Sequence, residues 1–204
     1  MAVITISRHF GAGATTLGSR IAKRLGYKYL NDELIKEVAK HVGVSVKDIS
    51  NVERRKPSKL VKFLEKIIST DAIERGRRRK QLDMDEYVKA IKEVILKLYE
   101  EGNVVIIGRG SNYILQGKED VIHVLVVASK RRRLHFLMDT YGLTKSQAER
   151  AIQRADVIRS EFLYYFSNRE NHDNPLIYTL CINMDYVTME QAEDIIIKLV
   201  QRTE

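Results

Sequence analysis

The residues from Val3 to Thr16 read VITISRHFGAGATT, a β-prone apolar run followed by a turn that contains two glycines. Residues 3–7 have the composition of a buried strand. After the turn, apolar side chains recur at helical spacing, at Leu17, Ile21 and Leu25. The chain is therefore predicted to begin with a strand, a glycine-bearing turn and an amphipathic helix.

Strands and helices alternate along the rest of the chain. Gly26 is placed to end the first helix, and a short strand at 27–30 then completes a βαβ unit. Helical patterns fill residues 33–101, before β-branched runs at 103–107 and 121–128 of the kind that a parallel sheet buries on both faces. Capping boxes begin two later helices, on either side of a short strand at 180–183. This order predicts one three-layer α/β domain over residues 1–204, with ligands at the carboxyl ends of its parallel strands.

Composition excludes several classes of protein. With 204 residues, of which 44% are hydrophobic, the chain can fill a core and is not expected to be disordered. The apolar runs are of strand length, far below the roughly 18 residues of a membrane span, so no membrane partner is expected. The N-terminus lacks the pattern of a secretion signal, which predicts a cytoplasmic protein. Cys181 is the only cysteine, so an intrachain disulfide is excluded, and no Cys/His spacing fits a zinc site.

Positive charge is concentrated in one part of the chain. The net charge is +8, and residues 53–80 hold eleven basic side chains against four acidic ones. Such a segment favours a phosphate-bearing partner, although a solvated helix face gives the same count. Phe63 is its only aromatic residue, so a base-stacking platform for nucleic acid is not favoured. An apolar stripe at 60–68 is explained by helix packing or by the contact of a homodimer.

The turn after the first strand lies where a phosphate-binding loop is expected, between a strand and a helix, but it matches the consensus sequence of such a loop only in part. Of the pattern G-x-x-x-x-G-K-[ST], Gly13 and Thr15 match, while Arg8 replaces the first glycine and Ala14 replaces the lysine. Small residues still allow main-chain amides to converge on phosphate oxygens at the start of a helix. The expected phosphate ligands are Gly11, Ala12, Gly13, Ala14, Thr15 and Thr16. A plain glycine-rich turn is the alternative interpretation.

Arg8 stands at the other end of this turn from the missing lysine. A guanidinium group binds phosphate in a bidentate manner, so Arg8 is a candidate for the positive charge that Ala14 cannot supply. The alternative is that Arg8 pairs with an acidic residue beneath the loop.

Three stretches, residues 4–16, 24–35 and 107–115, resemble the cytidylate-kinase-like family. This family typically reads S-R-x-[YF]-G-[SA]-G-G where true cytidylate kinases keep a lysine, so Ala14 is ordinary for it. The resemblance implies a P-loop nucleoside-monophosphate-kinase fold with a parallel sheet of about five strands. It also implies a helical acceptor-binding insertion over 33–101 and a lid over 144–175.

The same resemblance implies ATP-dependent phosphoryl transfer to a nucleoside monophosphate, with CMP or dCMP favoured and with ATP and Mg²⁺ as cofactors. Arg109 then matches the arginine that holds the acceptor phosphate, and Arg159 matches the lid arginine that contacts the transferring phosphoryl group. Arg133 is expected near the donor adenine. Asp32 is expected on the substrate side, and Thr15 is expected to hold Mg²⁺ through ATP.

Two departures from true cytidylate kinases keep other functions open. Asn31 stands where those enzymes have an aspartate. Gly110 replaces the aspartate of their Gly-Arg-Asp sequence. Together with Ala14, these residues also fit a nucleotide-binding sensor or scaffold that has lost catalysis. A nucleic-acid-associated protein that uses residues 54–80 is the third interpretation, and it predicts binding that weakens steeply with salt.

Overall fold

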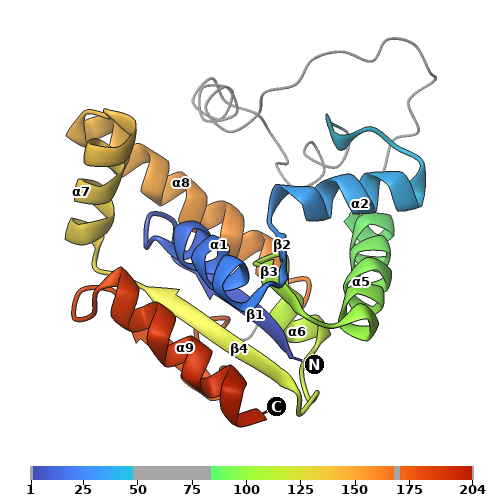
Figure 1. The fold of residues 1–204 in the computed structure, drawn as a ribbon. Coiled ribbons are helices and arrows are strands. Elements are labelled where there is room, and N and C mark those ends of the chain that lie inside the picture. Colours follow the sequence, from blue (N-terminus) through green and yellow to red (C-terminus); the bar gives the residue numbers. More distant parts are fainter. Residues whose placement is uncertain (1, 48–83, 168–170, 204) are drawn as a thin grey trace.

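The computed structural model describes residues 2–47, 84–167 and 171–203 (Figure 1). Within these ranges the chain forms a five-stranded, fully parallel sheet in the order β2-β3-β1-β4-β5. The strands are β1 (Val3–Arg8), β2 (Lys28–Leu30), β3 (Val104–Ile107), β4 (Val121–Val127) and β5 (Leu180–Asn183). This architecture confirms the predicted α/β fold with a parallel sheet. The basic run at 53–80 and its apolar stripe lie outside the described residues.

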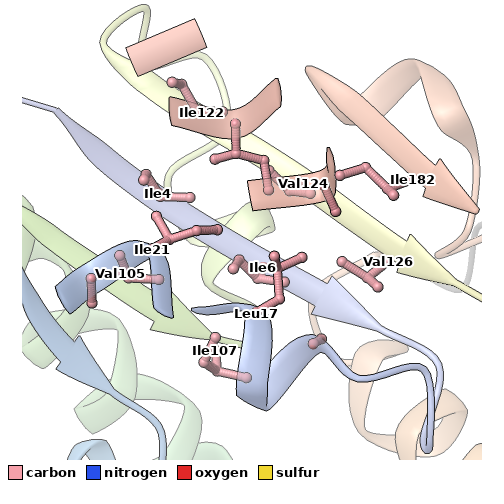
Figure 2. Packing of buried hydrophobic residues seen from close by; sticks show 14 of the residues in the cluster. Ile4, Ile6, Leu17, Ile21, Val105, Ile107, Ile122, Val124, Val126 and Ile182 are labelled. Atoms are coloured by element: carbon pink, nitrogen blue, oxygen red, sulfur yellow. The ribbon is translucent and has the colours of Figure 1, made fainter. Parts of the chain in front are cut away.

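Helices cover both faces of the sheet, which gives the three predicted layers (Figure 1). On one face α1 (Ala14–Leu25) and α9 (Met189–Thr203) share a core with four of the strands, which Figure 2 shows around Ile6 and Leu17. On the other face α2 (Asp32–Val42) and α5 (Met84–Glu101) form a second core with the sheet, which includes Tyr87 of α5 and Ile106 of β3. Successive side chains point to opposite cores, which explains why β3 and most of β4 are apolar and buried at consecutive positions.

The helix ends form where the sequence provides caps. Gly26 follows α1 with φ 70°, a left-handed conformation that suits glycine at a helix end. The Thr144 hydroxyl accepts the Gln147 N–H (3.3 Å), and the Gln147 side chain accepts the Thr144 N–H (2.8 Å). This predicted capping box begins α8 (Lys145–Leu163), which packs against α7 (Lys130–Tyr141) through an apolar cluster. Among the described residues, every helix is too short or too polar to cross a bilayer.

Two short helices were not expected. They are α6 (Ser111–Ile114), which follows β3, and the 3₁₀ helix η1 (Pro175–Ile177), which precedes β5. Sequence patterns indicated only a polar turn before β5, because three residues are too few to show a helical period. The Asn174 side chain caps η1 by accepting the Leu176 N–H at 3.1 Å. α6 follows the carboxyl end of β3, whereas η1 leads into the start of β5.

Candidate active site

The turn after β1 has the backbone of a tight anion-binding loop. Gly11 and Gly13 have φ angles of 82° and 85°, which other residues adopt only with strain. Space is also limiting, because a Cβ at Gly11 would lie 3.3 Å from the Arg133 carbonyl oxygen, and one at Gly13 would lie 3.1 Å from the Met189 side chain. The loop is therefore enclosed by the starts of α7 and α9, and both glycines are needed for its shape.

The start of α1 leaves a positive helix end beside this loop. The helix begins at Ala14, its first turn contains no acidic residue, and no side chain of the described residues caps it. Thr15 and Thr16 are exposed there, whereas Ala14 is only 2% exposed and packs into the core. Unsatisfied amides and the helix dipole favour an anion at such an end. The six predicted phosphate ligands thus lie in the turn after β1 and in the first turn of α1.

The turn after β3 is the most unusual stretch of backbone in the site. Gly108, Arg109 and Gly110 have φ angles of 67°, 61° and 71°, so three successive residues are left-handed. A non-glycine residue pays about 1–2 kcal/mol for this conformation, which makes Arg109 a strained position. The Gly108 N–H donates to the Ile6 carbonyl at 2.9 Å, so the turn is tied to β1 and the phosphate loop.

Close contacts explain both glycines of this turn. A Cβ at Gly108 would lie 2.5 Å from Nη1 of Arg8, and one at Gly110 would lie 2.8 Å from the Phe166 ring. The guanidinium of Arg8 therefore lies against the Gly108 backbone. Phe166 fills the space into which a carboxylate at position 110 would project, which gives a physical reason for the absence of that carboxylate.

Arg8 lies in a strongly cationic environment. Burial, followed by the neighbouring charge of Arg109, lowers the pKa of Arg8 from 12.5 to about 10; Arg159 lowers it further, while Tyr29 and Asp32 act in the opposite direction. The three arginines thus come from the ends of β1 and β3 and from α8 and lie within electrostatic reach of one another. A phosphate group would relieve this concentration of positive charge.

Arg159 reaches the site from the C-terminal part of α8. Its Nη2 donates to Oδ1 of Asp173 at 2.7 Å and to the Ser7 hydroxyl at 3.1 Å, and its Nη1 donates to Oδ2 of Asp173 at 3.2 Å. These bonds hold α8 against the end of β1. Although burial raises the pKa of Asp173, hydrogen bonds from His9 and Arg159 hold it well below its ordinary value.

Arg133 occupies a different place from the other three arginines. Its guanidinium is buried and makes a bidentate ion pair with Asp156 of α8, with a shortest distance of 2.6 Å. Arg131 and Arg132, its neighbours on α7, are exposed. Arg133 therefore joins α7 to α8 beside Gly11, at the edge of a pocket of about 610 Å³ between the two helices. Its predicted contact with the donor adenine stays a prediction.

The second strand brings Tyr29 and Asp32 to the same end of the sheet. The Tyr29 hydroxyl donates to the Thr15 carbonyl at 3.1 Å, and burial raises the pKa of Tyr29 to about 12. Asp32 opens α2 after Asn31 and is close enough to act on both Tyr29 and Arg8. Within the described ranges no three potential metal ligands cluster. This donor set fits Mg²⁺ only as an ion held mainly by phosphates and water, with the exposed Thr15 hydroxyl as one ligand.

Sequence reasoning missed several residues that the fold brings to the site. His9 belongs to the loop, and its Nε2 lies 3.4 Å from Asp173 Oδ2. Nε2 of His172 lies 3.6 Å from the same oxygen. The Tyr178 hydroxyl donates to the His172 carbonyl at 2.9 Å. Only the position of His9 within the loop could have indicated its role, because the other residues are more than 160 positions away along the chain.

The Asp173 ion pair predicts a specific dependence of stability on acid. The depressed pKa means that the unfolded chain takes up this proton first, so the contribution of the carboxylate is complete above its ordinary pKa of 3.8 and is lost as the pH falls through the folded value. Asp173→Asn is expected to lower the free energy of unfolding at pH 5, and this deficit should shrink at pH 3. Urea unfolding at both pH values measures the difference. A deficit that does not change with pH contradicts a charged Asp173.

Comparisons with known proteins agree with this fold. A crystal structure of an uncharacterized protein from Eubacterium ventriosum has a TM-score of 0.71 at 19% identity, over 98% of this chain and 99% of that one. A sugar kinase from a Janibacter species (0.53, 11% identity, 98% and 95%) and shikimate kinase from Bacteroides thetaiotaomicron (0.51, 15% identity, 98% of each chain) share the fold. No curated protein matches the chain. The sequence model of the cytidylate kinase-like family matches residues 3–186. The chain therefore belongs to the cytidylate kinase-like family, and this membership supports nucleotide-dependent phosphoryl transfer in general.

Proposed function

We propose that this protein transfers the γ-phosphoryl group of ATP to a nucleoside monophosphate, with CMP or dCMP favoured by the family resemblance. The observation that carries the proposal is the convergence of Arg8, Arg109 and Arg159 beside the glycine-bearing loop. Asp173 pairs with Arg159, and Asp32 lies close enough to act on Arg8. The phosphate of a nucleotide acceptor would form charge-assisted, bidentate hydrogen bonds with these guanidinium groups, which a neutral hydroxylated acceptor cannot do.

In the proposed reaction, an oxygen of the acceptor phosphate attacks the γ-phosphorus, and the bond to the β–γ bridging oxygen breaks to release ADP. The loop amides and the start of α1 bind the donor phosphates, while Arg8 and Arg109 hold the acceptor phosphate from the opposite side. Arg159 stabilises the charge that spreads over the moving phosphoryl oxygens. Mg²⁺, when bound, supplies further positive charge at the donor phosphates, and Thr15 is the side chain that would hold it.

The test is ADP release from ATP and Mg²⁺ in the presence of a panel of nucleoside monophosphates and small hydroxylated acceptors. Wild-type protein is compared with Arg159→Ala and with Arg202→Ala, which removes an exposed arginine from the last turn of α9. We expect turnover with a nucleoside monophosphate, a large loss in Arg159→Ala and none in Arg202→Ala. Turnover only with a hydroxylated acceptor would contradict the assigned substrate class.

A nucleotide-binding sensor or scaffold is the second candidate, and the placement of Ala14 favours it. This residue lies in the core at the position where the phosphate-loop pattern has lysine, so the donor phosphates lack that ammonium group. Nucleotide affinity measured by calorimetry separates the two candidates. Binding of ATP without turnover for any acceptor would support the sensor, and turnover above the Arg159→Ala background would exclude it.

A further inference from the structure

One carboxylate joins the phosphate loop to the lid. Asp173 accepts hydrogen bonds from both Nη atoms of Arg159, on α8, and lies 3.4 Å from Nε2 of His9, in the loop after β1. His172 approaches the same carboxylate at 3.6 Å. Groups from three separate parts of the chain therefore share a single anion at the carboxyl end of the central strand.

The geometry fixes Arg159 from two sides. Its Nη2 is held between Asp173 and the Ser7 hydroxyl of β1, so the guanidinium plane cannot rotate freely. A bidentate arginine–carboxylate pair of this kind adds directional precision to its energy. An arginine that must face a moving phosphoryl group depends on such preorganisation, since misplacement by about 1 Å can cost about 100-fold in rate.

The segment that carries Asp173 is itself firmly held. The Asp173 N–H donates to the Asn171 side chain at 3.0 Å, and the Tyr178 hydroxyl donates to the His172 carbonyl. Tyr178 is in turn buried at the start of β5 and receives a hydrogen bond from Asn112 of α6 at 3.4 Å. The segment that carries the Asp173 carboxylate is thus held by residues next to the sheet and not only by α8. Asp173 can therefore hold Arg159 in one orientation.

We propose that Asp173 is a positioning residue for phosphoryl transfer, which holds Arg159 and His9 together so that the lid arginine faces the phosphate loop. This inference rests on the function proposed above and adds a residue that acts through another. The charged groups that face Asp173 are Arg159 from α8, His9 from the loop and His172 from its own segment. All three act to keep the carboxylate ionised.

The kinetic test compares Asp173→Asn with Asp139→Asn, which changes an exposed carboxylate on α7. The amide keeps the size of the side chain but cannot accept both bonds of the arginine fork. In Asp173→Asn we expect kcat to fall by up to about 100-fold while the KM for ATP stays near the wild-type value. Asp173→Glu should recover part of kcat, because it restores the charge. A kcat equal to that of Asp139→Asn overturns the proposal. A variant in which only KM changes overturns it as well.

A second readout does not depend on turnover. Burial lowers the pKa of His172, and the Asp173 charge raises it part of the way back. Titration of the histidine ring protons by NMR, assigned with His172→Gln, should therefore show a further fall of the His172 pKa in Asp173→Asn. An unchanged value overturns the shared cluster. If the wild-type protein turns over no acceptor, the proposed function fails, and this titration alone still decides whether Asp173 organises the cluster.

Discussion

Arg8→Ala is expected to lower phosphoryl transfer by about 10²–10³-fold, the effect typical of removing one group that stabilises transition-state charge. The Arg8 guanidinium lies against Gly108 and within the field of Arg109 and Arg159. In the proposed reaction this position lets Arg8 act on the phosphate groups together with Arg109 and Arg159. Because we assign Arg8 to the acceptor phosphate, we expect a raised KM for the nucleoside monophosphate together with the lower kcat, and little change in the KM for ATP.

Removal of the Arg8 charge should raise stability while it lowers activity. A loss of activity with unchanged or higher stability cannot be explained by unfolding of the variant. A guanidinium that is partly buried beside two other cations destabilises the fold, as its lowered pKa indicates. Arg8→Met keeps the apolar stem and removes the charge, so its thermal midpoint of unfolding is expected to rise while its activity falls as far as that of Arg8→Ala. Arg202→Ala provides the control for both measurements. Wild-type turnover in Arg8→Ala would show that the site does not use this charge.

The fold could be predicted because its signals are local. The strand at 3–8, the helix that follows it and the capping box at Thr144 are each encoded within about ten neighbouring residues. The same is true of the glycines in the two active-site turns, where positive φ angles leave little choice of residue. Parallel strands then bring their carboxyl ends to one edge, so the general position of the site followed from the strand pattern alone.

The partners within the site could not be predicted in this way. Arg133 aligned as a donor-side ligand, yet its guanidinium makes a bidentate pair with Asp156, and only the packing of α7 on α8 determines that pairing. Asp173 lies within the lid expected over 144–175, but its contact with His9 spans most of the chain. Side-chain pairs of this kind depend on tertiary geometry, which periodicity and spacing do not encode.

Gly110→Ala is expected to destabilise the protein through two separable effects. The left-handed backbone at φ 71° costs a residue with a Cβ about 1–2 kcal/mol. The new methyl group would also lie 2.8 Å from the Phe166 ring, and such overpacking adds about 1–3 kcal/mol. Gly117→Ala is a matched control, since Gly117 has φ 81° with nothing within 4 Å of its Cβ position. Urea unfolding of the two variants should therefore differ by the cost of the clash alone.

The clash also predicts a rescue. Phe166→Ala removes the ring from above Gly110, so the double variant should be less destabilised than the sum of the two single changes. Gly110→Asp, which restores the Gly-Arg-Asp sequence of true cytidylate kinases, meets the same ring and is expected to lose stability without gaining activity toward CMP. Additive single and double variants would show that Phe166 can move aside. In that case the ring would not explain the glycine, and a carboxylate at position 110 would be compatible with this site.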